Sequence, residues 1–196
     1  MHPSAARPEY VAAFSEIAGR IAAPLADLPK RVRPIRMYVA GGAALHFYTG
    51  ERTSMDIDAS FSHRIALPEN LEVSYRDADG GARLLYFDRQ YNDTFALMHE
   101  NAREDSVPLS LKGIDTAVLD VRLLSAHDLA VSKISRFSSQ DRDDIAALAR
   151  HGLIRASALR LRAEQALAGY VGNLETLRTS ITLACHIVED VRKNKK

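Results

Sequence analysis

The sequence predicts an α+β protein: a small mixed sheet flanked by helices, with a C-terminal helical bundle. Short apolar runs with the character of β-strands are concentrated between residues 35 and 124. Everything from Ser125 onward has instead the periodicity and capping signals of helices. Strands followed by a run of helices indicate an α+β chain. We expect two parts, residues 1–124 with an N-terminal helix and the αβ core, and residues 125–196, a helical part that completes the functional site.

Length and composition restrict the class of protein. With 196 residues and 46% hydrophobic content, the chain can bury one core with a helical appendage. Its single cysteine, Cys185, excludes an intramolecular disulfide and a cysteine-based zinc cage, and it fits a reducing compartment. No apolar stretch approaches the roughly 20 residues of a membrane span, and no signal-peptide pattern is present. We expect a cytoplasmic protein without a membrane partner.

The charge is small in total but unevenly distributed. The formal net charge of +1 argues against a wholesale nucleic-acid binder. Residues 151–196, however, contain eight Lys or Arg against four Asp or Glu, and residues 30–36 contain four more Lys or Arg. Two interpretations stay open, a solvated surface with a basic tail or a nucleic-acid footprint.

The predicted N-terminal helix covers residues 8 to 23. Tyr10, Phe14, Ile17 and Ile21 recur at helical spacing, and Pro24 is expected to kink or end the helix. A second, short helix is expected from Ala43 to Tyr48, closed by Gly50.

The predicted strands share apolar runs or period-two alternation between glycine-rich or polar turns. A hairpin is expected around Asp79-Gly80-Gly81. The expected strands are Ile35–Val39, Asp56–Phe61, Leu71–Tyr75, Arg83–Phe87, Thr94–Glu100 and Ala117–Leu124.

Capping signals divide the helical part. Ser125 with Asp128 and Ser138 with Asp141 have the S-x-x-D spacing of capping boxes, so two helices should begin at these serines. Two longer helices are expected over 155–170 and 174–192, separated by Gly172-Asn173.

A double glycine follows the first predicted strand. Gly41 and Gly42 lack a Cβ, which allows a ligand to approach the backbone, and a helix beginning at Ala43 would point free N–H groups at that ligand. The pattern suits a phosphate, although an ordinary tight turn between a strand and a helix is the alternative.

Two aspartates lie one residue apart on the next predicted strand. Asp56 and Asp58 should project from the same face while Ile57 enters the core. Two carboxylates so close repel each other unless a cation lies between them, and Mg²⁺ prefers a few carboxylates supplemented by water and substrate phosphates. We therefore expect Asp56 and Asp58 to bind Mg²⁺ or Mn²⁺. The alternative is a solvated face of an edge strand.

The order of these parts resembles a known signature. Gly41-Gly42, Leu45, Gly50, Arg52 and the pair Asp56 and Asp58 are similar to the G-G-x-x-L…G-x-R-x-T-x-D-x-D pattern of the DNA polymerase β-type nucleotidyltransferase superfamily, nearest to its AbiEii and MenT-like toxin–antitoxin branch. The resemblance implies that Gly41, Gly42, Arg52 and Thr53 bind a nucleotide. The family's threonine falls at Thr53 or Ser54, so either residue could supply the hydroxyl.

The same branch has a downstream lysine and an acidic motif. By this resemblance Lys133 would contact the triphosphate of a bound NTP, and Asp141 would assist catalysis or hold Lys133 in place. The residue types are suitable, because lysine is a point charge for phosphate and a nearby acid keeps it protonated. Structural roles are the alternative: Asp141 as a capping residue and Lys133 as cover for apolar surface. Asp144, three residues after Asp141, is a supporting candidate.

A third carboxylate, which such enzymes commonly add from a neighbouring strand, is not identified by the sequence. Asp88, Glu100 and Asp120, with His99 in place of a carboxylate, are the candidates, and Glu100 or His99 would face the site if the strand Thr94–Glu100 lies beside Asp56 and Asp58. His46, on the helix after the glycines, is expected to be packed or capping.

The resemblance implies a metal-dependent enzyme that moves a nucleoside monophosphate from an NTP to a hydroxyl of RNA, such as tRNA, or of protein, as a member of a bacterial toxin–antitoxin pair. It implies a cognate toxin or antitoxin as a partner. Two alternatives remain: a non-catalytic binding protein or antitoxin of the same fold, and a small-molecule transferase of the aminoglycoside type. The choice of NTP is left open by the sequence.

Overall fold

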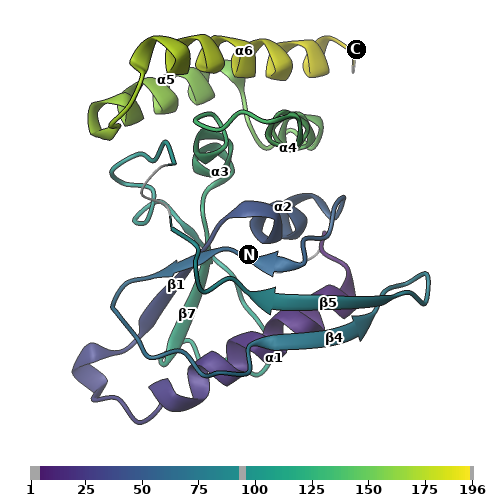
Figure 1. The fold of residues 1–196 in the computed structure, drawn as a ribbon, viewed down its shortest axis with the longest axis vertical. Helices are drawn as coiled ribbons and strands as arrows, with labels where there is room; N and C mark the ends of the chain where they lie inside the picture. Colours follow the sequence, from purple (N-terminus) through teal and green to yellow (C-terminus); the bar gives the residue numbers. More distant parts are fainter. Residues whose placement is uncertain (1–4, 93–95, 195–196) are drawn as a thin grey trace. The chain divides into compact units, whose positions relative to one another are not determined.

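The chain forms two compact units in the computed structural model, which describes residues 5–92 and 96–194 (Figure 1). The sheet unit comprises residues 1–91 and 106–123, and the helical unit comprises residues 92–105 and 124–196. All strands of the described residues lie in the first unit, and four of the six α-helices lie in the second. The α+β class predicted from the sequence is confirmed.

Two small sheets make up the sheet unit. The first has the strand order β3-β1-β7-β6, in which β1 and β7 run parallel and β3 and β6 pair antiparallel at the edges. The second has the order β2-β5-β4, with β2 and β5 parallel and β4 and β5 forming the predicted hairpin. The strands are β1 (Ile35–Val39), β2 (Asp56–Ile57), β3 (Ala59–Phe61), β4 (Glu72–Arg76), β5 (Ala82–Phe87), β6 (Val107–Pro108) and β7 (Leu119–Leu123).

Helix α1 (Pro8–Leu25) covers the second sheet, packing on β4 and β5. The four side chains that predicted it, Tyr10, Phe14, Ile17 and Ile21, are all buried. Burial of such side chains contributes roughly 1.5 to 3 kcal/mol each. The helix continues one residue beyond Pro24, because a proline in the last turn interrupts little of the remaining helix. The 3-10 turn η1 (Lys30–Val32) then leads into β1.

The single strand predicted over Asp56–Phe61 is broken at Asp58, which corrects the sequence prediction. Asp56 and Ile57 pair with β5, whereas Ala59 to Phe61 pair with β1. The Asp58 carbonyl accepts a hydrogen bond of 2.8 Å from the Ala40 N–H. Asp58 therefore lies where the chain leaves one sheet and enters the other.

The strand predicted over Thr94–Glu100 is wrong for residues 96–100, and Thr94 lies outside the described residues. This segment forms turns instead: the Ala102 N–H donates to the His99 carbonyl at 3.0 Å, and the Asp105 N–H donates to Asn101 at 2.9 Å. Its apolar residue, Leu97, is buried without strand pairing. An apolar alternation over a few residues does not distinguish a strand from a well-packed loop.

The helical unit contains α3 (Ala126–Ser132), α4 (Ser139–Arg150), α5 (Ala156–Ala166), η2 (Leu167–Gly169) and α6 (Leu174–Lys193). Both predicted starts are confirmed. The Ser125 hydroxyl accepts from the Asp128 N–H, and Ser138 and Asp141 form a complete capping box. Helix α6 packs on α4 and α5.

One arginine fixes three segments of the helical unit. Arg162 of α5 donates to both carboxylate oxygens of Asp128 on α3, at 2.7 and 2.9 Å, and to Asp105 at 2.7 Å. Two parallel bonds from a guanidinium to one carboxylate are among the strongest polar contacts in proteins. Arg162 thereby holds the 96–105 segment and α3 against α5.

Among the helices of residues 5–92 and 96–194, none has the length and apolar character required to cross a membrane.

Candidate nucleotide site

The two glycines lie at the start of α2 (Gly41–Thr49), which begins two residues earlier than the predicted Ala43. Gly41 has a φ of 58°, a left-handed conformation that favours glycine. A Cβ on Gly41 would collide with the Asp58 carboxylate, and one on Gly42 would lie 2.6 Å from the Ser54 Oγ. The glycines are therefore required, because the side chains of the carboxylate segment pack directly on the backbone of this turn.

The first turn of α2 lies at the same place and has no capping bond from its N-cap residue. Its N-cap residue, Ala40, has no side chain to accept a hydrogen bond, and no acid lies in the first turn. A helix N-terminus of this kind carries partial positive charge and suits an anion. The Asp58 carboxylate, against Gly41, is the negative group that the structure places at this end of the helix.

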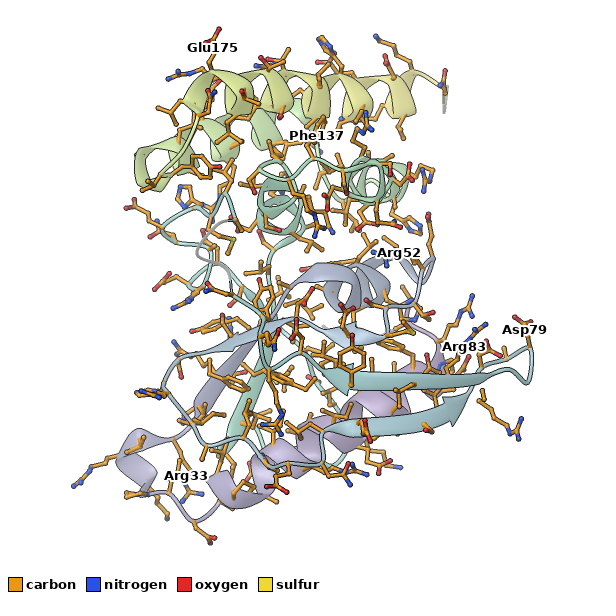
Figure 2. The ribbon with its side chains drawn as sticks, viewed as in Figure 1. Arg33, Arg52, Asp79, Arg83, Phe137 and Glu175 are labelled. Atoms are coloured by element: carbon orange, nitrogen blue, oxygen red, sulfur yellow. The ribbon has the colours of Figure 1, made fainter. Side chains whose placement is uncertain are left out.

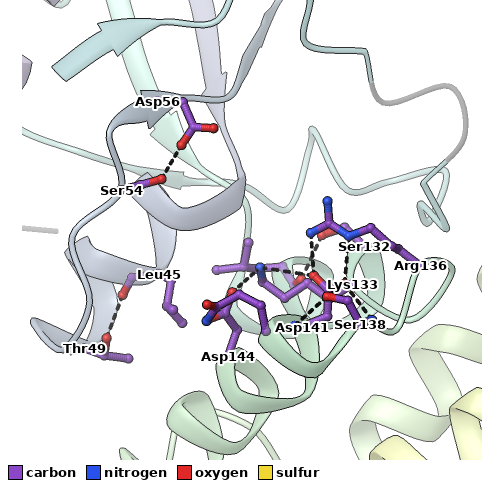
Figure 3. Close-up of polar contacts among 12 residues, drawn as sticks. Leu45, Thr49, Ser54, Asp56, Ser132, Lys133, Arg136, Ser138, Asp141 and Asp144 are labelled. Carbon is purple, nitrogen blue, oxygen red and sulfur yellow. Dashed lines mark hydrogen bonds and ion pairs between the residues drawn. The ribbon is translucent and has the colours of Figure 1, made fainter. Parts of the chain in front are cut away.

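Ile57, between Asp56 and Asp58, enters the core as the alternating pattern predicted, and the projection of both carboxylates from one face stays a prediction. Both aspartates are half-buried. The Ser54 hydroxyl donates a short hydrogen bond to Asp56 Oδ1 (Figure 3). Among the described residues, Ser54 and not Thr53 contacts Asp56 through its hydroxyl. Ser54 is therefore the residue that orients the Asp56 carboxylate.

Asp88 is the candidate third carboxylate that the sheet brings beside the pair. The parallel register sets Ile57 opposite Phe87, and the next N–H along β5, that of Asp88, donates to the Ile57 carbonyl at 3.1 Å. Asp88, directly after the end of β5, therefore lies next to Asp58, directly after the end of β2. Its Oδ1 accepts from the Gln90 N–H at 2.8 Å.

The other candidates for the third carboxylate are placed differently. Asp120 lies on β7, within 3.1 Å of Arg122 and 3.8 Å of Arg36. His99 and Glu100 belong to the helical unit and not to a strand paired with β2.

Arg52 lies in the loop between α2 and β2 (Figure 2) and is half-buried. Its Nη2 would be 3.2 Å from a Cβ placed on Gly42. The guanidinium therefore lies at the glycine turn, and its nucleotide contact stays a prediction.

A buried aromatic cluster supports α2 from the side of α1. His46 Nε2 accepts a hydrogen bond of 3.1 Å from the Arg7 N–H, and its ring packs edge-on against Tyr10 with centroids 4.6 Å apart. Burial lowers the pKa of His46, so the imidazole is neutral at pH 7. Burial also raises the pKa of Tyr10, and the charge of Asp56 adds to this effect. His46 is a packed residue, as expected.

A second polar cluster lies in the helical unit, at the junction of α3 and α4. Lys133, at the C-terminal end of α3, donates to Asp144 Oδ2 at 2.6 Å (Figure 3). Asp141 Oδ1 is farther from the ammonium, at 4.0 Å. All three side chains are at least nine-tenths buried. Asp144 is therefore the hydrogen-bond partner of Lys133, and Asp141 adds a longer ion pair to the same ammonium group.

Asp141 is bound instead by its own capping box and by Arg136. Arg136 Nε and Nη2 donate to the two carboxylate oxygens at 2.8 and 2.7 Å, and the Ser138 N–H and hydroxyl donate at 3.0 and 2.7 Å. Burial alone would raise the pKa of this carboxyl, but these hydrogen bonds outweigh burial and lower the pKa to about 2. Phe137, between the two donors, has a φ of 48°, a conformation that costs about 1 kcal/mol for a non-glycine residue.

Comparison with known families gives a match over most of the chain. Residues 19–179 match the family described as nucleotidyltransferase of unknown function (DUF6036). The chain belongs to this family. No curated protein and no solved structure matches the chain. Membership implies an NTP as the substrate class, and both the glycine turn and the Lys133 cluster fall within the matched residues.

The donor set of this nucleotidyltransferase domain fits a divalent cation with oxygen ligands. The described residues contain no ready group of three or more His, Cys, Asp or Glu side chains that could hold a metal. Mg²⁺, however, is commonly bound by one or two carboxylates completed by water and substrate phosphates. Asp56 and Asp58, half-buried at a helix N-terminus that suits phosphate, offer this incomplete set.

Three residues of these clusters are not among the main sites that the sequence predicts: Ser54, Arg136 and Asp144. The sequence offers Ser54 and Asp144 only as alternative or supporting candidates, and their spacing to Asp56 and Asp141 is the signal that identifies them. Arg136 had no such signal, because its role depends on the left-handed turn at Phe137.

Proposed function

We propose that this chain transfers a nucleoside monophosphate from an NTP to a hydroxyl acceptor, with a divalent cation, Mg²⁺ or Mn²⁺, held by Asp56 and Asp58. The observation that carries the proposal is the packing of the Asp58 carboxylate on Gly41, at the uncapped N-terminus of α2. In this arrangement the carboxylate oxygens would bind the cation, and the N–H groups of the same turn would bind phosphate. Family membership supports the same reaction class.

The acceptor oxygen bonds to the α-phosphorus, the bond from that phosphorus to the bridging oxygen breaks, and pyrophosphate leaves. The hydroxyl proton passes to a carboxylate, for which Asp88 is our candidate. A bound cation would neutralise charge on the phosphates.

The remaining residues bind and orient the substrate. The α2 N–H groups, with Arg52, hold phosphate oxygens, and Ser54 fixes the rotamer of Asp56 through its hydrogen bond. Lys133 adds positive charge for the triphosphate, as the family resemblance implies, while Asp144 holds its ammonium group through the 2.6 Å hydrogen bond. Asp141 supports this cluster by ordering Arg136 and the start of α4.

The biological role follows the same resemblance. We propose RNA such as tRNA, or protein, as the acceptor, and a bacterial toxin–antitoxin system as the context, with a cognate partner protein. The chain would act in the cytoplasm.

A second candidate function is nucleotide binding without turnover. It is favoured by one observation, namely that the described residues contain no preformed group of three metal-binding side chains.

Incubation of the protein with each α-labelled NTP, Mg²⁺ or Mn²⁺, and total RNA or protein tests both functions. We expect label in one acceptor with wild type and none with Asp58→Asn. The matched control is Asp79→Asn, which removes an exposed carboxylate at the tip of the β4–β5 hairpin (Figure 2). Absence of label from every acceptor, together with calorimetric NTP binding, would overturn transfer in favour of the binding function.

A further inference from the structure

A basic groove lies within the helical unit, where the C-terminal end of α4, the start of α5 and the C-terminal end of α6 meet. It encloses about 690 Å³. Three of its lining side chains are cations, Arg155, Arg192 and Lys193, against one acid, Glu189. The groove belongs to a C-terminal segment with eight Lys or Arg and four Asp or Glu.

The backbone adds to this positive charge. Helix α5 begins inside the groove, with Ala156 and Ser157 in its lining. Its N-cap residue, Arg155, makes no side-chain capping bond, and the first turn has no acid. The N–H groups of this turn carry partial positive charge beside the three cationic side chains.

The arrangement of the cations indicates what kind of anion fits. Arg155, Arg192 and Lys193 are all exposed, and they come from two different helix ends. Lys193 is also 3.3 Å from the exposed Asp190. A single small anion is usually held by converging, buried donors, whereas exposed cations spread along a groove suit the repeated charges of a polyanion.

We propose that the basic groove binds the sugar-phosphate backbone of RNA. The inference rests on the proposed function and deepens it, because it selects RNA as the acceptor. Transfer to a hydroxyl requires an acceptor that carries hydroxyl groups, and every ribose of RNA has a 2′-hydroxyl that DNA lacks. Phosphate contacts of this kind give affinity without strong sequence preference.

The test is the fluorescence anisotropy of a labelled single-stranded RNA with the full chain, without NTP, over a series of salt concentrations. Replacement of Arg155 and Arg192 by Glu should weaken binding at least about tenfold. It should also reduce the slope of log K against log salt by about 1.4, since each contact to a single strand contributes about 0.7.

The matched control reverses the same amount of charge elsewhere on the same two helices. Arg160 and Arg178 line a separate hollow between α5 and α6. Arg160→Glu with Arg178→Glu should leave most of the affinity intact. If both double variants weakened RNA binding equally, the RNA would be attracted by the overall charge of the two helices. That result would overturn the groove as the binding site. Should Arg155→Glu unfold the chain, as thermal unfolding would reveal, Arg192→Glu with Lys193→Glu replaces it.

Two further outcomes would contradict the proposal: no binding of RNA by wild type at low salt, or equally tight binding of duplex DNA or of anionic lipid vesicles. Failure of the groove proposal can be distinguished from failure of the proposed transfer activity. RNA binding that depends on the groove, without transfer of label, would overturn transfer alone. Transfer of label to protein, with no RNA binding, would overturn the groove alone.

Discussion

Lys133 donates a hydrogen bond of 2.6 Å to Asp144, and both side chains are buried in the helical unit. Removal of one partner from such a pair typically costs about 3 to 5 kcal/mol, and Asp141, 4.0 Å from the ammonium, would compensate only part of the charge left by Asp144. We expect Asp144→Ala to lower the free energy of unfolding by this amount in urea titrations. Loss of the 3.1 Å bond from Gln140 adds to the effect.

The exposed pair Lys193 and Asp190, 3.3 Å apart, is the matched control. Asp190→Ala should cost less than about 1 kcal/mol, because water screens an exposed pair. Replacement of both buried partners, Lys133→Met with Asp144→Leu, should recover most of the stability lost in the single variant. A cost for Asp144→Ala no larger than that for Asp190→Ala would contradict a buried charge pair.

Asp141 should make the protein sensitive to strong acid. Its pKa is about 2 in the folded chain and 3.8 ordinarily. Between these values the unfolded chain binds a proton that the folded chain does not, so stability is present above about pH 4 and is lost as the pH falls toward 2. Above about pH 4, Asp141→Asn should have a lower melting temperature than wild type. As the pH falls from about 4 toward 2, its melting temperature should change less than that of wild type. An unchanged pH dependence would show that Arg136 and Ser138 do not hold the ionised carboxylate in solution.

Local signals account for what the sequence predicted well. A capping box is complete within four residues, so Ser138 and Asp141 predicted the start of α4 without knowledge of the rest of the chain. The order of Gly41, Gly42, Asp56 and Asp58 predicted that these residues act together, and the Asp58 side chain does pack on Gly41; their binding of nucleotide and metal stays a prediction.

Non-local pairing accounts for what the sequence did not predict. The break at Asp58 arises because neighbouring residues join different sheets, which depends on β1 and β5, far away in sequence. The same register places Asp88 beside Asp58. That Lys133 lies closer to Asp144 than to Asp141 depends on how α3 and α4 pack, which a motif does not specify.

His46 should destabilise the folded chain in mild acid. Burial lowers its pKa from 6.5, and Nε2 must stay unprotonated to accept from the Arg7 N–H. Below about pH 6.5 the unfolded chain gains a proton that folded His46 resists, so stability falls as the pH decreases. His127, whose pKa is also lowered by burial, contributes in the same direction.

His46→Gln should therefore reduce, but not abolish, the loss of melting temperature between about pH 7 and pH 5. His186→Gln, at an exposed position of α6, is the control and should retain the wild-type dependence. If both variants behave like wild type, protonation of His46 does not oppose folding.

Gly41 offers the sharpest test of the glycine turn, because the effect of backbone strain can be separated from the effect of a collision. Gly41 and Gly113 both lie in the sheet unit with positive φ, 58° and 84°. A Cβ on Gly113 meets nothing within 4 Å, whereas one on Gly41 collides with the Asp58 carboxylate. Alanine at Gly113 should cost only the strain of a left-handed residue, about 1 to 2 kcal/mol. Alanine at Gly41 should cost more and, because Asp58 must move, should abolish Mg²⁺-dependent NTP binding in calorimetry. Equal NTP affinity in the two variants would show that Asp58 does not need its contact with the glycine turn.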